Sequence, residues 1–272
     1  MGSKSKKHDK SVAEPSPSVA LVEQDQIAQL EAKLAALKAQ PSLALVAAAG
    51  RSERKLDLGC GLTPKEGYEG VDIRGNEKAK HIVDLFKFPW PFEDNSVDEI
   101  HASHLLEHVP AREVEERDLS GCTKDGLVRT PNLADRDYLG ADMLFAFMDE
   151  CYRILKPDAW MRVIVPSGRS NRAFWDPTHR RFFMQETFLY FAADWRKMNG
   201  LHHYRIACNF AVECTHSLPG EESLRSAESQ AMRFQHYWNV TVDWMAKLKK
   251  LPPSDPSAPP VVPNVSMDGA PK

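Results

Sequence analysis

The sequence predicts an α/β fold built on a doubly wound, mostly parallel β-sheet. Short apolar runs recur along the middle of the chain, and several of them end in glycine or aspartate. A helix with one apolar face precedes the last of these runs, and two later segments alternate between apolar and polar residues. Strands separated by turns and helices in this order are typical of a parallel sheet, and the alternating pair predicts antiparallel strands at its edge.

The two ends of the chain differ in composition from its centre. Both are poor in large apolar residues, which leaves too little buried surface to offset the entropy of ordering. We therefore predict a disordered basic tail over residues 1–19 and a disordered Pro-rich tail over 251–272. The length that remains fits a single folded domain, expected over 51–250.

Composition also limits the compartment and the partners. The chain has 272 residues, with 35 Lys or Arg and 38 Asp or Glu, so its net charge is -3. This balance gives no overall attraction to nucleic acid, although a local basic patch stays open. No apolar run is long enough to cross a membrane, and the five cysteines form no CxxC pair. We expect a cytoplasmic protein in a reducing compartment.

A helical segment is expected over residues 20–50. Within 20–40 the apolar residues recur at helical spacing: Ile27, Leu30, Leu34 and Leu37. An apolar stripe of this kind must be buried somewhere. It packs either on its own domain or on a second copy of the chain, so a homodimer through 20–40 is one of two open alternatives.

Five strands and one long helix account for the centre of the chain. The strands are expected at 54–58, 70–73, 81–85, 98–102 and 160–165, and the helix at 139–155. The alternating pair lies at 204–214 and 238–248, of which the second would also suit a helix.

Two segments interrupt this order. Residues 111–138 are charged and then loop-like, which indicates an insertion, and long loops of this kind are usually functional or mobile. Residues 167–200 follow the fifth strand, and we expect them to cover a substrate.

The first strand runs into the sequence Asp57-Leu58-Gly59-Cys60-Gly61. Glycines have no Cβ, so the loop can approach a ligand closely. In open α/β sheets, ligands bind at the carboxyl ends of the strands, which is where this loop would lie. An ordinary strand-to-loop turn explains the same residues, so the motif is weak by itself.

The next two strands end in aspartate. A carboxylate at Asp72 can accept both hydroxyls of a ribose, and one at Asp84 can accept from an exocyclic amine. Together with the glycine loop, this spacing predicts a nucleoside site. Three solvated turn aspartates are the alternative.

Several motifs together resemble class I S-adenosylmethionine (SAM)-dependent methyltransferases. They are Leu56–Gly61, Gly70–Ile73, Asp84-Leu85, residues 88–100, Leu105–His108 and Tyr152–Pro157. The resemblance covers residues 54–166, and it is nearest to small methyltransferases with a Gly-Cys-Gly-x-x-Pro loop and no assigned substrate. It implies a Rossmann-like sheet of seven strands with an antiparallel edge hairpin, and SAM as the cofactor.

The resemblance also implies which strand ends hold the cofactor. The methionine part would contact the first loop, with an aspartate below it. The ribose and the adenine would contact the ends of the second and third strands, and the transferred methyl would face the end of the fourth. The implied residues, in that order, are Asp57, Gly59, Cys60, Gly61, Asp72, Ile73, Asp84, Leu85, His101, Ala102 and Ser103.

The chain departs from the family between the first two strands. Only ten residues separate Gly61 from Asp72, and Pro64 stands where the family often has a third glycine. We therefore expect at most a turn or two of helix there, and weaker cofactor binding because fewer helix N-terminal donors are present. A dinucleotide site of the NAD type also requires glycine at this position, which disfavours NAD.

Histidines near the fourth strand are the candidate catalytic groups. His104 and His108 share one face if their segment is helical, and a neutral imidazole there would deprotonate an acceptor. Local hydrogen bonds that shape the pocket wall are the alternative. Metal ligation by the pair is a third, but no third ligand is identifiable from the sequence, so we predict no metal.

A second cluster lies at residues 175–183. His179 is a further candidate base, Trp175 would stack on the acceptor, and Arg180 or Arg181 would bind an anionic group. A packed structural turn with an aromatic anchor explains the cluster equally well.

The sequence thus predicts methyl transfer from SAM to an oxygen or nitrogen acceptor on a small molecule, a sugar or a glycan. Family members that methylate exocyclic amines of bases carry Asn/Asp-Pro-Pro-Tyr where His101–His104 stand here, which disfavours an adenine-N6 enzyme. The alternative is a catalytically silent SAM-binding or scaffold protein with the same fold.

Overall fold

A computed structural model describes residues 53–74, 78–119, 139–201, 204 and 206–254. The chain divides after Ser52 into two units, and all that follows concerns the second, which begins at Glu53. The expected helix over 20–50, its dimerisation, the basic tail, most of the Pro-rich tail and residues 120–138 of the insertion lie outside the described residues.

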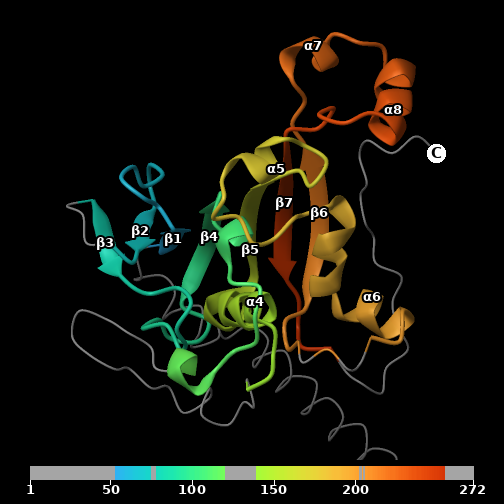
Figure 1. The fold of residues 1–272 in the computed structure, drawn as a ribbon. Helices are drawn as coiled ribbons and strands as arrows, with labels where there is room; N and C mark the ends of the chain where they lie inside the picture. The colour runs from blue at the N-terminus through green and yellow to red at the C-terminus, as the bar shows by residue number, and fades with distance from the viewer. Residues whose placement is uncertain (1–52, 75–77, 120–138, 202–203, 205, 255–272) are drawn as a thin grey trace, which may run out of the picture. The chain divides into compact units, whose positions relative to one another are not determined.

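A seven-stranded sheet forms the centre of this unit, in the order β3-β2-β1-β4-β5-β7-β6 (Figure 1). Strands β1 to β5 are parallel, and β7 runs antiparallel to both β5 and β6. The predicted fold class is confirmed, including the antiparallel pair at the edge. The strands are β1 (Lys55–Leu58), β2 (Glu69–Asp72), β3 (Ala79–Ile82), β4 (Val97–Ser103), β5 (Leu155–Pro166), β6 (Phe210–His216) and β7 (Asp243–Lys250).

One face of the sheet carries the core. Buried apolar residues alternate along β4, β5 and β7, and they pack with helix α4 (Met143–Ile154), which lies in front of the sheet in Figure 1. Alternate residues of a strand point to opposite faces, so the charged residues between them gather on the other face. Glu99 of β4 and Arg162 of β5 form an ion pair there.

The other helices are short and lie mainly beyond the carboxyl ends of the parallel strands or beside β6. They are the 3-10 helices η1 (Leu106–His108), η2 (Glu116–Leu119) and η3 (Gln185–Phe191), and the α-helices α5 (Arg172–Trp175), α6 (Ala193–Met198), α7 (Gly220–Ser223) and α8 (Ala227–His236). Within the described ranges, no helix combines the length and the apolar character that crossing a membrane requires.

Several expected element boundaries need correction. Strand β3 ends at Ile82, so Asp84 lies two residues after the strand rather than closing it. Strand β5 begins at Leu155, five residues before the expected start at 160, and Asp158 within it has a φ of 63°. Helix α4 begins four residues later than expected because the Asp142 side chain accepts from the Leu144 N–H and caps it.

The connection between β6 and β7 was not predicted as helical. It carries α7 and α8, which lie beyond the ends of β6 and β7 in Figure 1. Helix α8 buries none of its residues, so its sequence has no apolar stripe by which it could have been found. The expected hairpin is therefore an antiparallel pair joined by a long connection.

A buried ion pair fastens α4 to the segment before β4. The Arg153 and Glu150 side chains are 2% and 0% exposed, and their Nη2 and Oε1 atoms lie 2.5 Å apart. Arg153 also donates to the carbonyls of Phe92 and Trp90, and Glu150 accepts from the Trp90 N–H. The pair thus satisfies its own charges and holds residues 90–92 in place.

Candidate cofactor and acceptor site

The loop after β1 requires glycine at two positions. Gly59 and Gly61 have φ angles of 65° and 56°, in the left-handed region that other residues enter at a cost of about 1–2 kcal/mol. A Cβ on Gly59 would also lie 2.8 Å from Cδ1 of Leu105. Residues 59–68, all of them described, contain no helix, which agrees with the expected limit of a turn or two. The chain turns directly from this loop into β2.

Asp57 is buried beneath the loop and supports it. Its Oδ2 accepts from the Lys65 N–H at 2.8 Å, and its Oδ1 lies 2.8 Å from Nδ1 of His101, its register partner on β4. The His101 ring also contacts Tyr68 at 5.9 Å between centroids. Asp57 and His101 therefore fix the loop from below.

The end of β4 differs from what the family resemblance implied. His101 lies two residues before the end of the strand, on the charged face of the sheet. Ala102 is fully buried in the core on the opposite face. Of the three residues implied to face the methyl, only Ser103 stands at the strand end.

Asp72 ends β2 directly beside the glycine loop. Its Oδ2 accepts from the Gly61 N–H and its Oδ1 from the Arg74 N–H, each at 2.9 Å. A carboxylate has about four acceptor positions, so about two remain for a ligand. Ile73, the next residue, is 59% exposed and offers an apolar surface at the same place.

Asp84 follows β3 and lies at the same edge of the sheet. Its Oδ1 accepts from the Phe86 N–H at 3.0 Å, and its Oδ2 lies 3.9 Å from Nζ of Lys87. Leu85 is buried in the core, so its side chain serves packing and only its backbone can meet a ligand.

Cys60 lies between the two loop glycines with a partly exposed side chain. Burial, and then the Asp72 and Asp57 carboxylates, raise the pKa of its thiol to about 11. Only about a thousandth of the thiol is ionised at pH 8, and the thiolate is the nucleophile.

We expect iodoacetamide to label Cys60 slowly at pH 8, with a rate that climbs about tenfold per pH unit up to pH 10. A saturating ligand on the loop should suppress this labelling. Peptide mass spectrometry resolves Cys60 from the buried Cys151, Cys208 and Cys214. Fast labelling at pH 7, equal to that of a free thiol, would contradict the described environment.

His104 follows β4 with its backbone in the left-handed region, at a φ of 52°. Its Nδ1 lies 3.2 Å from Oε1 of Glu107, and this hydrogen bond raises the pKa of the imidazole. Glu107 is 1% exposed. A non-glycine residue in this conformation is held by its surroundings, and such residues concentrate at functional sites.

His104 and His108 do not share a helix face, because the segment that joins them is not one helix. Helix η1 is a 3-10 helix that contains His108 but not His104. His108 instead meets His179, with ring centroids 4.8 Å apart in an edge-to-face arrangement. A ligating atom of Glu107 lies within 4.8 Å of atoms on both rings. The three candidate histidines therefore meet around Glu107.

The two arginines after His179 are held by the protein itself. The Arg181 guanidinium donates to the carbonyls of Val109 and Pro110, and it pairs with Asp142 at 3.0 Å. Arg180 is exposed and donates to the Pro177 carbonyl at 2.6 Å. The anion that Arg181 binds in this structure is thus Asp142, the cap of α4.

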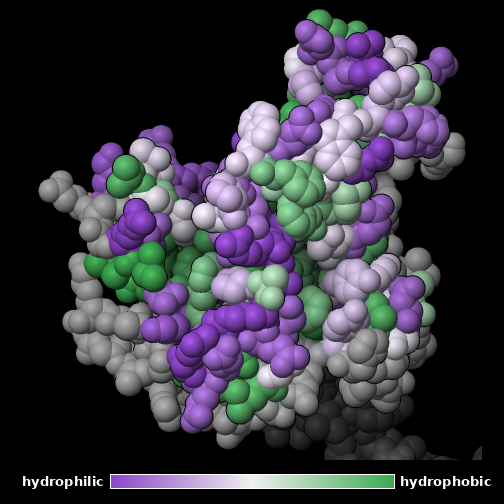
Figure 2. Space-filling model, in the orientation of Figure 1, coloured by the Kyte–Doolittle hydropathy of each residue, from purple (hydrophilic) through white to green (hydrophobic). Residues whose placement is uncertain are grey.

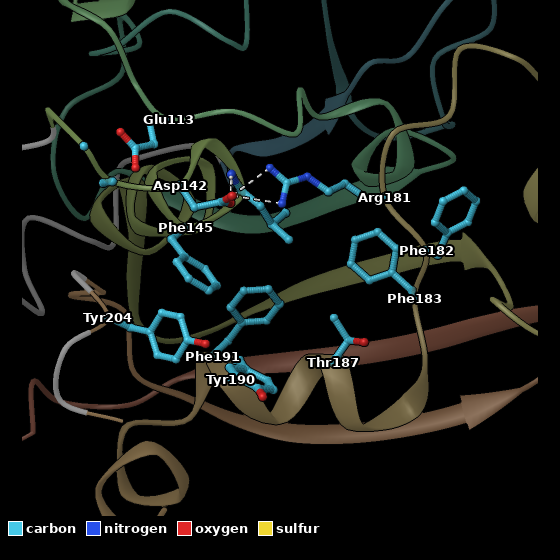
Figure 3. A pocket seen from close by; sticks show the side chains of 13 residues that line it. Glu113, Asp142, Phe145, Arg181, Phe182, Phe183, Thr187, Tyr190, Phe191 and Tyr204 are labelled. Carbon is cyan, nitrogen blue, oxygen red and sulfur yellow. Dashed lines mark hydrogen bonds and ion pairs between the residues drawn. The ribbon is translucent and has the colours of Figure 1, made fainter. Parts of the chain in front are cut away.

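A cavity of about 520 Å³ opens beside Arg181 (Figure 3). Figure 3 shows the ion pair of Arg181 and Asp142 at one side and aromatic rings around the rest. Its aromatic lining comes from α4, the segment after Arg181, η3 and the chain beyond α6: Phe145, Phe182, Phe183, Tyr190, Phe191 and Tyr204. The volume, and a largely aromatic lining with a few polar side chains (Glu113, Thr187 and the Arg181–Asp142 pair), are typical of a small-molecule site.

An exposed aromatic patch surrounds α5. Figure 2 shows hydrophobic side chains gathered there, where Phe174 and Phe182 stack at 4.6 Å between ring centroids. The neighbouring Trp175 is 74% exposed, so its ring is free of the core. Its expected stacking on an acceptor stays a prediction.

No protein-family model and no curated protein matches this chain. Solved structures resemble it distantly. A SAM-dependent methyltransferase from Archaeoglobus fulgidus is 16% identical, with a TM-score of 0.41 over 73% of this chain and 86% of that one. One from Mesorhizobium loti is 13% identical, with a TM-score of 0.38 over 76% and 97%. The 1,6-didemethyltoxoflavin-N1-methyltransferase of Burkholderia thailandensis, solved with its substrate and S-adenosylhomocysteine, is 11% identical, with a TM-score of 0.37 over 90% and 94%. Likenesses this distant carry no conclusion about chemistry, which has to come from the residues of this chain.

Proposed function

We propose that this chain is a SAM-dependent methyltransferase that binds SAM across the carboxyl ends of β1, β2 and β3. The observation that carries the proposal is the Asp72 carboxylate. It is anchored to the N–H of Gly61 in the glycine loop, and it keeps about two acceptor positions, the number that the two ribose hydroxyls require.

The neighbouring strand ends suit the remaining parts of the cofactor. Because β1 lies between β2 and β4, a ribose on Asp72 would direct the sulfonium toward the glycine loop and Ser103. The adenine would lie toward β3, with its amine on Asp84 and one face on the exposed Ile73. Asp57 and His101 would act as positioning residues that hold the loop.

The proposed reaction is a direct displacement. A lone pair on an acceptor oxygen or nitrogen attacks the methyl carbon, the bond from that carbon to sulfur breaks, and S-adenosylhomocysteine leaves as a neutral thioether. The acceptor then gives up its proton to water or to a nearby base. Since the methyl group is already activated, most of the catalysis would be positioning of the two reactants.

We place the acceptor at the end of β4, beside His104, His108 and His179. A small molecule or a single sugar unit is the acceptor we propose. Arg181, two residues after His179, borders a cavity with the volume of a small-ligand site, although the lining of that cavity contains none of the three histidines. The exposed Trp175 and Arg180 lie four residues before and one residue after His179, and they would contact the acceptor from outside.

Calorimetric titration tests the proposal. We expect one S-adenosylhomocysteine to bind per chain. We expect no heat from NAD, because an NAD-binding loop requires a third glycine where Pro64 stands in this chain. Incubation with SAM and fractionated metabolite pools should then release S-adenosylhomocysteine. Binding without turnover in any pool would leave the silent SAM-binding protein as the function, and preference for NAD would overturn both.

A further inference from the structure

We propose that Glu107, His108 and His179 form a binding site for a divalent transition metal of the zinc type. One ligating atom of each residue lies within 4.8 Å of those of the other two. Two imidazoles and one carboxylate are a recurrent zinc set, which leaves a fourth position open. The three ligands could not be recognised together from the sequence, because His179 lies 71 positions beyond His108.

The Glu107 carboxylate provides an observation independent of the clustering. Glu107 is 1% exposed, and among the described residues its Oε2 has no hydrogen-bond partner. Its Oε1 is satisfied by His104. A buried carboxylate oxygen without a partner is costly, and a cation at the cluster would remove that cost.

Hydrogen bonds dictate which nitrogen of His108 is available. The single hydroxyl hydrogen of Thr178 is donated to Oδ1 of Asp176 at 2.6 Å. The Thr178 oxygen, 3.0 Å from Nδ1 of His108, must therefore accept a hydrogen from that nitrogen. In the neutral ring this leaves the lone pair on Nε2, the form in which histidine binds metal.

The same reasoning applies to His179. Its Nδ1 lies 2.9 Å from the carbonyl oxygen of Ala173, which can only accept. The hydrogen is on Nδ1, and the lone pair is again on Nε2. In each ring, Nδ1 is thus fixed by a hydrogen bond. Metal-binding histidines usually donate a hydrogen bond in the same way from the ring nitrogen that does not bind the metal.

Metal binding requires the three ligand atoms to lie closer together than the 4.8 Å within which they stand here. Bonds of about 2.0–2.2 Å to a tetrahedral ion bring ligand atoms to about 3.3–3.5 Å of each other.

The metal would join two separate segments of the site. Glu107 and His108 belong to η1, directly after β4, and His179 belongs to the segment after α5. Backbone hydrogen bonds already run between them, from the Arg180 and Arg181 N–H groups to the Glu107 carbonyl. Metal binding needs neither SAM nor an acceptor, so it can be tested independently of the proposed methyl transfer.

Zn²⁺ titration of the full chain tests the site. After dialysis against chelator, we expect calorimetry to report one tight Zn²⁺ per chain and no competition from Mg²⁺, which does not favour imidazole. His108→Ala, His179→Ala and Glu107→Gln should each weaken that binding at least about tenfold. Thr178→Val should weaken it roughly 10–100-fold, because it releases the His108 ring.

Two controls separate this site from other histidines. His236→Ala removes a histidine of α8, and a His202→Ala/His203→Ala double variant removes an adjacent pair in the sequence. Both should keep the tight Zn²⁺. S-adenosylhomocysteine affinity of His179→Ala should stay within about twofold of wild type, which shows that the fold and cofactor site are intact.

The proposal is overturned if the wild-type chain binds no stoichiometric Zn²⁺, or if the three ligand variants bind it as tightly as wild type. Loss of binding in the His202/His203 double variant alone would also overturn it. Glu107 is buried, so its replacement by Gln can reduce Zn²⁺ binding simply by destabilising the fold. The unfolding midpoint is therefore measured for each variant, and the Glu107→Gln result is interpreted together with that of His179→Ala, whose side chain is only half-buried.

Discussion

Replacing Asp72 with alanine is expected to weaken S-adenosylhomocysteine binding by roughly a hundredfold or more. Two hydrogen bonds from ribose hydroxyls to a carboxylate would be lost, and bonds to charged groups contribute about 1.5–3 kcal/mol each. The substitution also removes the carboxylate that accepts from the Gly61 N–H. The glycine loop is then no longer hydrogen-bonded to the end of β2, which weakens binding further. Calorimetric titration of the variant measures the change directly.

The fold should survive this substitution. The Gly61 and Arg74 N–H groups that Asp72 accepts from are exposed, so water can replace the carboxylate. We expect the free energy of unfolding to change by less than about 1 kcal/mol. Asp72→Asn keeps one acceptor oxygen and should lie between wild type and alanine, while Glu228→Ala on the exposed α8 should bind as wild type. Unchanged affinity in Asp72→Ala would refute the ribose assignment.

Arg153→Ala is expected to destabilise the protein by about 3–5 kcal/mol. The substitution leaves Glu150 fully buried without its counter-charge, and it removes donors from the Phe92 and Trp90 carbonyls. Urea denaturation followed by circular dichroism measures the loss.

An exposed ion pair is the matched control. Arg117 and Glu115 are 69% and 52% exposed, so Arg117→Ala should cost no more than about 1 kcal/mol. Replacing both buried partners, as Arg153→Met with Glu150→Leu, should recover the part of the loss that comes from the buried charge, while the Trp90 N–H and the two carbonyls stay without these partners. If Arg153→Ala and Arg117→Ala cost the same, the buried network does not have the role we assign to it.

Where the pattern is local, the sequence predicts this structure well. The apolar runs that lead into Gly59 and Asp72 became β1 and β2, the run at 98–102 became β4, and the ten-residue spacing after Gly61 correctly excluded a long helix. Alternation along 204–214 and 238–248 located the antiparallel pair, although β6 and β7 begin five or six residues later. These features depend on neighbouring residues and on side-chain period, which a single sequence contains.

Contacts between residues far apart in the chain could not be predicted from the sequence. The partner of His108 is His179, and the partner of Asp57 is His101; both depend on how distant segments lie in the fold. His104 and His108 had the spacing of a helix, but the left-handed backbone at His104 separates them. Arg181 had the character of a ligand-binding group, and only the structure shows that Asp142 and two carbonyls occupy it.

A crystal structure with S-adenosylhomocysteine bound tests the central claim most directly. The account predicts the ribose hydroxyls on Asp72, the adenine between Ile73 and Asp84, and the sulfur near the glycine loop and the end of β4. The acceptor should bind beside that sulfur, next to His104 and the His108–His179 pair. A nucleoside bound elsewhere, or a ribose out of reach of the Asp72 carboxylate, would contradict the account.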